Sequence, residues 1–579
     1  MIKKREKTIQ AADLQPAAPG ANRSTPSLIP PILCTIAYML CALLMAAPLS
    51  RIIDPVVRLQ LPFGAALAQV GAWLPINLGL DNNTLASQTN TSILEFIGLV
   101  LLLFVVYGLY ALYITRLPAE SKRYRHIHIL VLAGAALVGL IFVFTPAMLS
   151  HDIIVYASYS RLMANYHANP YFVPLTTFPH DQFVPMNYWA NSVAAYGPIW
   201  LTVCGLIGFF VGPQVAGYIL AFRFFALTAH LLNTWLVMRT LRSMGQTQRT
   251  ITLGALLYAL NPLVLLESSF GGHNDVFMMT FMLIGVCLAV RAQKRDTLSS
   301  LKGYLPPLIF FTLASLVKFT MLPVIALFIA FIAWKTLSKP STINTTTSTP
   351  GKVNRHWKQA DTSVIISAAA AAILALVFYG PYWIGHSIGD IHYSFTSPPS
   401  SLFGENSIML AIYQWARANN LFHFSFVGTI FRFLGARWFW DGINFVVLGI
   451  VCILSALWLR RSTTFRTFLL ASLAALGVLL IVTPWFFSWY VTWLVVLATV
   501  ALPVRESRIG CALLAFSLVF SASAFLTYLF LYGYPPFGTW SGLVFLTTIA
   551  PPLLAFLFTF LLWQPLKDLR LSGSESVPS

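Results

Sequence analysis

The stretch IHILVLAGAALVGLIFVFTPAML (127–149) is a continuous apolar run, and the polar, aromatic segment HDIIVYASYSRLMANYHANPY (151–171) follows it directly. An apolar run of about 20 residues is long enough to cross the hydrocarbon core of a bilayer as a helix. Residues 127–149 therefore predict a membrane-spanning helix. The polar residues over 150–197 predict a loop gathered at one face of the membrane, where chemistry can take place.

The composition of the chain indicates an integral membrane protein. Of its 579 residues, 58% are hydrophobic and only 9% are charged, and the mean hydropathy is +0.75. A soluble domain needs a larger charged surface than this. We predict an all-α polytopic integral membrane protein with about 12–14 transmembrane helices. The candidate spans are 28–49, 93–115, 127–149, 214–238, 250–266, 276–291, 304–334, 362–384, 443–460, 466–483, 487–503, 508–531 and 541–562.

The formal net charge of +18 comes from short basic clusters between the apolar runs. This distribution argues against nucleic-acid binding and is typical of topology signals, because cytoplasmic loops are enriched in Lys and Arg. We therefore expect a multi-pass protein of the cell membrane with a cytoplasmic N-terminus and an extracytoplasmic loop 150–197. The clusters lie at 3–7, 116–128, 239–249, 291–302 and 335–358.

Changes in composition divide the chain into two membrane modules. The region 336–361 contains the run TINTTTSTP and is typical of a disordered cytoplasmic linker. The sequence holds no phosphate-binding glycine loop and no dinucleotide-binding fingerprint. The expected parts are a disordered cytoplasmic tail (1–27), a catalytic module (28–335), the linker, a second membrane module (362–565) and a C-terminal tail (566–579).

Asp152 begins the first group of residues with chemical potential. On a helix that begins there, Asp152, Tyr156 and Tyr159 fall on one face. A partly desolvated carboxylate at the membrane boundary can remove the proton from a hydroxyl nucleophile. It can equally cap the helix N-terminus, where Asp is favoured. The residues by themselves leave both readings open.

A second group follows the segment NPLVLLESS (261–269), which contains Glu267. In GGHND (271–275), two glycines allow close backbone approach, and three polar residues stand where a helix begins. His273 can donate to sugar hydroxyls or phosphate oxygens, while Asp275 can also serve as a helix cap. The spacing is not a known metal-ligand pattern, so we expect no metal; a divalent cation is the alternative.

Lys318 is the single charge in a long apolar stretch, within ASLVKFTMLP (314–323). An ionisable group inside a membrane segment is costly and usually has an anionic partner, for which a phosphate is the natural candidate. Snorkelling of the side chain to the membrane surface is the structural alternative. Arg223 lies in a similar apolar setting and invites the same interpretation.

Aromatic residues near the polar segments can stack on sugar rings or line a lipid groove. They also form the interfacial belts of many membrane proteins. Trp485 and Trp489 lie in TPWFFSWYVTW (483–493), and Tyr171 and Tyr196 lie in the loop 150–197. The six cysteines all lie within apolar runs, which favours packing roles.

Five motifs in one order carry a resemblance to a known family. They are HDIIVYASYSRLMANYHANPY, AYGPIW, NPLVLLESSFGGHNDVFMM, LASLVKFTMLP and PWFFSWYVTWLV. In this order they resemble the GT-C polyprenol-phosphate-mannose-dependent mannosyltransferases, especially the α-1,6-mannosyltransferases that build lipoglycan mannan. The resemblance covers residues 127–335 well and the C-terminal half loosely.

The resemblance implies a GT-C fold and the transfer of a sugar, which in this family is mannose, with inversion of its anomeric centre. The donor would be a polyprenyl-phosphate sugar, and the acceptor would be a glycan or glycolipid on the extracytoplasmic face. No cofactor would be needed. Asp152 would be the general base, with Asp181 as a rival. His273, Asn274, Asp275 and Lys318 would lie around the donor phosphate or the acceptor sugar. The lining residues would be His151, Tyr156, Tyr171, Tyr196, Trp485 and Trp489.

The chain departs from the family pattern at His151, where a small residue is usual, and this affects the acceptor geometry. Glu405, in the unassigned region 385–442, is a candidate helper. A polytopic carrier or flippase for lipids or saccharides remains the alternative function, although we see no internal symmetry of the kind that transporters show.

Overall fold

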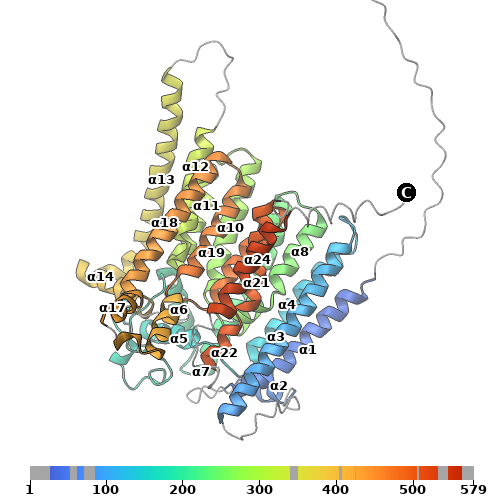
Figure 1. The fold of residues 1–579 in the computed structure, drawn as a ribbon, viewed down its shortest axis with the longest axis vertical. Helices are drawn as coiled ribbons and strands as arrows, with labels where there is room; N and C mark the ends of the chain where they lie inside the picture. The colour runs from blue at the N-terminus through green and yellow to red at the C-terminus, as the bar shows by residue number, and fades with distance from the viewer. Residues whose placement is uncertain are drawn as a thin grey trace, which may run out of the picture.

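The computed structural model describes residues 27–52, 61–70, 85–338, 350–402, 407–423, 425–504, 507–532 and 545–563. All regular secondary structure in these ranges is helical, which confirms the predicted all-α polytopic fold (Figure 1). Ten helical segments there are long and apolar enough to cross a membrane, and the bent pair α8–α9 makes eleven. They comprise α1 (Ile29–Arg51), α3 (Leu85–Arg116), α4 (Tyr124–Phe144), α7 (Val215–Ser243), α8 (Gln248–Ala259) with α9 (Pro262–Ser269), α10 (Asp275–Lys294), α12 (Leu322–Leu337), α13 (Pro350–Trp383), α18 (Arg437–Arg461), α19 (Phe465–Val482) and α21 (Arg508–Ser523) with α22 (Leu526–Tyr532).

Shorter apolar helices account for the rest of the predicted span count. Two of the predicted spans, 487–503 and 541–562, correspond to apolar helices of fewer than 18 residues. The short elements are α2 (Gly64–Val70), η1 (Leu175–Thr177), α6 (Pro198–Phe210), α11 (Leu301–Val317), η4 (Ser488–Val491), α20 (Thr492–Val500), η5 (Leu502–Val504), η7 (Phe545–Ile549) and α24 (Ala550–Leu561).

The helix bundle has a basic end and a polar, aromatic end. At the basic end, the Arg249 N–H donates to the Ala119 carbonyl (3.2 Å), which joins the clusters 116–128 and 239–249. From there α4 runs toward Asp152, and α10 runs in the opposite direction from Asp275 to Lys294. Each helix is about 30 Å long. The two aspartates therefore lie a full membrane thickness away from the basic clusters.

Helices α5 (Asp152–Ala164) and α6 both remain at the polar end. Each has 13 residues, which is too short to cross a bilayer core of about 30 Å. They pack closely, because a Cβ added to Gly208 would stand only 2.7 Å from the Ser160 carbonyl oxygen. The segment 198–243 therefore crosses the membrane once, through α7, and loop 150–197 lies opposite the basic clusters.

The predicted span 304–334 is a helical hairpin. Helix α11 ends at Val317, Lys318 adopts an extended conformation, and η2 (Phe319–Met321) leads into α12. The Phe311 and Phe328 rings, on either side of the turn, pack 5.0 Å apart. The tip of the hairpin carries Lys318.

The predicted linker 336–361 is helical at both of its ends. Helix α12 extends to Leu337 and α13 begins at Pro350, while residues 339–349 lie outside the described ranges. The segment VNRHWKQADT (353–362) has no Pro or Gly, so it can extend the apolar helix that follows.

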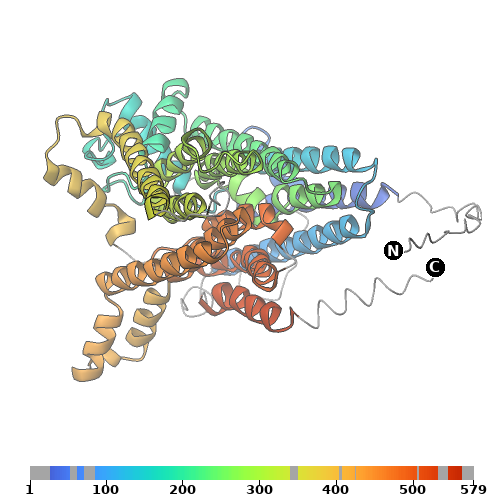
Figure 2. The same cartoon turned by 90° about the horizontal axis from the view of Figure 1, so that it is seen from above.

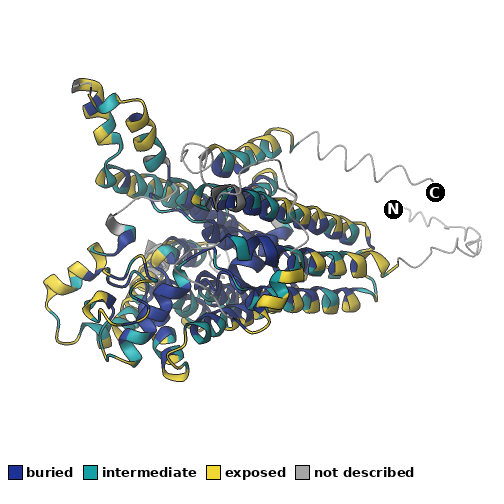
Figure 3. Ribbon diagram, turned by 90° about the horizontal axis from the view of Figure 1, so that it is seen from below, coloured by how far each residue is buried: buried dark blue, intermediate teal, exposed yellow. Residues whose placement is uncertain are grey.

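The region 385–442 forms small helices that extend from the bundle at its polar end (Figures 1 and 2). These are α14 (Ile388–Thr396), α15 (Pro399–Leu402), α16 (Ile408–Ala418), η3 (Leu421–His423) and α17 (Ser425–Leu434). They carry much of the exposed surface (Figure 3). Glu405 lies outside the described residues, as do nearly all of the two predicted tails.

Arg223 binds both the segment before α5 and the segment before GGHND (271–275). Its buried guanidinium donates to the carbonyls of Val143 (3.0 Å), Thr145 (2.8 Å), Ala147 and Phe270 (2.8 Å). The first three residues lead into α5, and Phe270 precedes GGHND. The expected phosphate partner is thus replaced by backbone carbonyls, so Arg223 positions the polar motifs instead of binding a ligand.

Replacing Arg223 by methionine should destabilise the fold strongly, because it leaves these four carbonyls unpaired in the protein interior. We expect a loss on the order of 3–5 kcal/mol, seen as a large drop in the thermal unfolding temperature in detergent. Arg295→Met, at an exposed position, is the matched control and should change little. Equal unfolding temperatures for the two variants would contradict this role.

Candidate active site

Asp152 is the first residue of α5, and its carboxylate gathers three donors. Oδ2 accepts hydrogen bonds from the hydroxyls of Tyr156 and Tyr196 and contacts Nδ1 of His273, each at 3.2 Å. His151 occupies the N-cap position and makes no side-chain capping hydrogen bond, while the Asp152 carboxylate contacts side chains. The carboxylate is therefore directed into a polar cluster, which argues against the simple capping role. Its side chain keeps 20% of its surface exposed.

His273 stands between two carboxylates. Its Nδ1 contacts Asp152 Oδ2, and its Nε2 lies 3.2 Å from Oε2 of Glu267. The imidazole is fully buried and stacks on the Trp489 ring, with 4.0 Å between ring centroids and 14° between planes. The ring cannot rotate without losing both contacts and the stacking. His273 is thus held in one orientation between α5 and α9.

Glu267 belongs to this cluster, although the sequence motifs did not indicate a role for it. It is 1% exposed, and its Oε1 accepts hydrogen bonds from Ser488 Oγ (2.9 Å) and the Tyr528 hydroxyl (2.7 Å). It therefore connects His273 to the C-terminal module. A signal was present in NPLVLLESS, because a single acid in an apolar run is as costly as Lys318.

Lys318 pairs with a protein carboxylate. Its Nζ donates to Oδ1 of Asp275 at 2.8 Å, and Trp493 Nε1 donates to the same oxygen at 2.7 Å. Nζ also lies 4.0 Å from the centre of the Tyr490 ring, within the range of a cation–π interaction. Asp275 is the first residue of α10 but, like Asp152, it binds a distant side chain instead of capping its helix.

Gly197 allows the loop to approach the tip of the hairpin. Its N–H donates to the Val317 carbonyl at 3.0 Å. A Cβ at this position would stand only 2.0 Å from the Leu316 carbonyl oxygen, so any other residue would push the chains apart. This contact brings the Tyr196 ring to 5.9 Å from Lys318 Nζ while its hydroxyl binds Asp152. Pro198 then begins α6.

Contacts within the cluster shift the pKa values of His273 and Asp152. Burial opposes the charged form of His273, but its contacts with the carboxylates of Asp152 and Glu267 raise its pKa to about 9. Burial also acts to raise the pKa of Asp152, yet the hydrogen bond and charge of His273, with the charge of Lys318, hold it below its usual value. At neutral pH the site therefore contains an imidazolium beside an ionised Asp152.

The remaining predicted lining residues surround this cluster at different distances. The Tyr171 hydroxyl donates to the Tyr196 carbonyl (2.8 Å), and the Trp485 ring packs against Trp189 (5.8 Å). His151 packs against Tyr188 (4.5 Å). Asn274 is 1% exposed, and its amide makes no hydrogen bond to the described residues. Tyr156 and Tyr196 thus contact the Asp152 carboxylate directly, whereas Trp489 stacks on its partner His273.

Asp181 belongs to a separate structural group. Its carboxylate pairs with Arg161 and accepts hydrogen bonds from the Tyr166 hydroxyl (2.9 Å) and the Phe183 N–H (2.9 Å). These partners fold the loop 150–197 on itself and leave the carboxylate 3% exposed. Asp181 is therefore poorly placed to act as a base. Among the described residues, no group of three His, Cys, Asp or Glu side chains is placed to hold a metal ion.

Comparisons with known proteins agree with the sequence motifs. Residues 62–336 match the family model for the α-(1→6)-mannopyranosyltransferase N-terminal domain. The α-(1→6)-mannopyranosyltransferase A of Mycobacterium tuberculosis is 24% identical over 333 residues, which are 56% of each chain. The α-(1→6)-mannopyranosyltransferase B of Corynebacterium glutamicum is 30% identical over 108 residues, 18% of this chain and 17% of that protein.

The chain thus spans little more than half of these relatives' length at most. No solved structure matches it. The family match contains Asp152, His273 and Lys318 but ends before Trp489. The resemblance seen in the sequence is confirmed, and the all-α polytopic fold agrees with the GT-C architecture.

Removing the partner of the buried Asp275 should destabilise the protein. Lys318→Met leaves an unpaired buried carboxylate, which costs about 3–5 kcal/mol, whereas Lys318→Met/Asp275→Leu should recover much of that loss. Thermal unfolding in detergent measures both. Asp441→Asn breaks an ion pair whose carboxylate is 38% exposed and should cost less than about 1 kcal/mol. A double variant no more stable than the single one would contradict the pairing.

The raised pKa of His273 predicts a pH-dependent stability. Protonated His273 stabilises the fold. This stabilisation is complete below the pKa of the unfolded chain, about 6.5, and is lost as the pH rises through the folded-state pKa of about 9. Glu267→Gln removes one of the two carboxylates that raise the pKa of His273. The variant should therefore lose this stabilisation at a lower pH than wild type. Unfolding temperatures measured from pH 6 to 10 test this, with exposed His126→Gln as the control. Identical pH profiles for Glu267→Gln and wild type would disprove the assignment.

Proposed function

We propose that the protein transfers a mannosyl residue from a polyprenyl-phosphate donor to a hydroxyl of a glycan or glycolipid acceptor, and the match of residues 62–336 to the α-(1→6)-mannopyranosyltransferase N-terminal domain supports this proposal. The observation that carries the proposal is the placement of Asp152. This partly exposed carboxylate lies at a helix end, opposite the basic clusters of a membrane-spanning bundle.

Asp152 is suited to be the general base. Its hydrogen bonds to described residues all reach Oδ2, so Oδ1 can accept the proton of an acceptor hydroxyl. The hydroxyl oxygen then bonds to the anomeric carbon as the bond from that carbon to the phosphate oxygen breaks. The phosphate leaves with the bonding electron pair. A single displacement of this kind inverts the anomeric centre.

Lys318 is the group best placed to meet the leaving phosphate. One of its three N–H donors is used by Asp275, and the others can stabilise the negative charge that develops on the phosphate. Asp275 is paired with Lys318 and fully buried, so it acts through Lys318 and does not touch the donor. His273 is also fully buried and orients Asp152. Both are therefore positioning residues in this proposal.

The proposed orientation has the N-terminus on the cytoplasmic side and the Asp152 cluster on the extracytoplasmic face. The basic clusters support it, because such clusters favour the cytoplasmic side. A polyprenyl phosphate in the outer leaflet could reach Lys318 laterally. The sugar–phosphate bond is already activated, so the reaction requires neither ATP nor a nucleotide sugar.

The proposal is tested by transfer of radiolabelled mannose from synthetic polyprenyl-phosphate-mannose to a lipid-linked mannoside. We expect transfer by wild type and a loss of about 10²–10⁴-fold in Asp152→Asn, because the general base is removed. Asp296→Asn, at an exposed position of the basic end, should keep full activity.

Full activity in Asp152→Asn would refute Asp152 as the general base. A folded wild type that transfers no sugar from any polyprenyl-phosphate donor to any acceptor would refute the enzyme and favour a carrier.

A further inference from the structure

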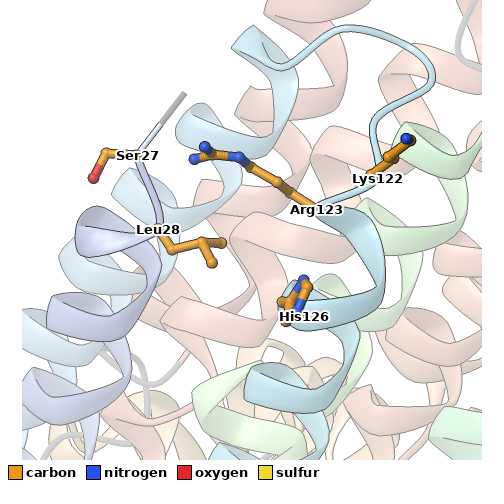
Figure 4. Close-up of a pocket in the computed structure, with 5 residues that line it drawn as sticks. All are labelled: Ser27, Leu28, Lys122, Arg123 and His126. Atoms are coloured by element: carbon orange, nitrogen blue, oxygen red, sulfur yellow. The ribbon is translucent and has the colours of Figure 1, made fainter. Parts of the chain in front are cut away.

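A cavity of about 470 Å³ lies at the basic end of the bundle, about 30 Å from the Asp152 cluster along α4. It opens between the beginning of α1 and the beginning of α4 (Figure 4). Its lining consists of Ser27, Leu28, Lys122, Arg123 and His126. No step of the proposed sugar transfer uses this cavity.

The cavity has a strongly basic rim. A neighbouring hollow of about 430 Å³ shares Lys122 and adds Arg125 and Arg242 to its lining. None of these three residues, nor Arg123, forms an ion pair with the described part of the chain. The adjacent acid, Glu120, accepts a hydrogen bond from the Gln248 N–H (3.2 Å). Four positive charges therefore surround these hollows with little compensation.

An apolar surface begins directly below the rim. Ile29 is 63% exposed, Leu33 58% and Ile129 56%, and all three lie on membrane-spanning helices close to the cavity. Such side chains face lipid when the helices are in a bilayer. The site thus offers cations at the membrane surface and an apolar wall within the membrane.

We propose that this cavity binds the phosphate group of an anionic glycerophospholipid in the leaflet at the basic end, with the acyl chains lying along α1 and α4. A soluble phosphate would leave the apolar wall unused. A zwitterionic lipid carries a cation of its own that the basic rim repels. Basic pockets between membrane helices recognise anionic head groups by these interactions. This site is independent of the sugar-transfer proposal.

The test uses the purified full-length protein in detergent and measures bound lipid by native mass spectrometry. Wild type should retain phosphatidylglycerol in preference to phosphatidylcholine, and glycerol phosphate should compete poorly. Lys122→Gln/Arg123→Gln should weaken phosphatidylglycerol binding at least tenfold, because each cation near an anionic head group contributes substantially. The matched control Lys294→Gln/Lys302→Gln removes the same charge from exposed positions at the same end of the bundle and should change binding little.

Three results would overturn the site. Equal retention of the two lipids by wild type would show that charge is not recognised. Equal weakening in both double variants would indicate general electrostatic attraction. Competition by glycerol phosphate as effective as that by the lipid would identify a soluble anion as the ligand. Comparison of the two lipids on wild type needs no variant, so it remains decisive if a substitution impairs folding.

Discussion

The polar end of this protein depends on the contacts that hold His273 between Asp152, Glu267 and Trp489, which we call the His273 clamp. The imidazole contacts Asp152 on one side and Glu267 on the other and lies flat against Trp489. These residues come from α5, α9 and the C-terminal module, so one buried ring connects three parts of the chain. An ionised carboxylate is costly in such an environment unless it is paired. Each charge in the clamp therefore requires the others.

A second buried cation, Arg223, holds α5 and the GGHND segment at a fixed distance from each other. Arg223 binds the chain before α5 and the chain before GGHND at the same time. Backbone carbonyls that would otherwise be unpaired in the protein interior accept its donors. The guanidinium fork suits this role better than an amine because its donors diverge in one plane. The position of Asp152 relative to His273 thus depends on a residue that touches neither.

The two ends of the bundle suit different partners. At the polar end, the cluster around Asp152 holds three carboxylates (Asp152, Glu267 and Asp275) and two basic groups (His273 and Lys318), nearly balanced in charge and mostly buried. Such an arrangement favours positioned proton transfer over simple attraction of anions. The basic end carries uncompensated charge beside lipid-facing side chains. Attraction of anionic head groups is the chemistry expected there, and it requires no fine geometry.

Hydropathy and charge along the sequence were sufficient for the membrane class, for eleven of the spans and for the two ends of the bundle. These properties are local sums over about 20 neighbouring residues. The same reasoning marked Asp152 and Lys318 correctly as unusual. It predicted full spans at 487–503 and 541–562, where the described residues form the shorter apolar helices Ser488–Val500 and Leu546–Leu561, because composition alone does not show where a helix ends.

Only the tertiary structure decided which charges meet. Asp152 and His273 are 121 positions apart, and Ser488 and Glu267 are 221 apart. No local pattern encodes a contact across such distances, so Asp275 looked like a helix cap and Arg223 like a phosphate ligand. The sequence by itself determined which residues are costly to bury in a membrane. The fold determined how each of them is paired, because burial makes a partner necessary and packing selects which one is within reach.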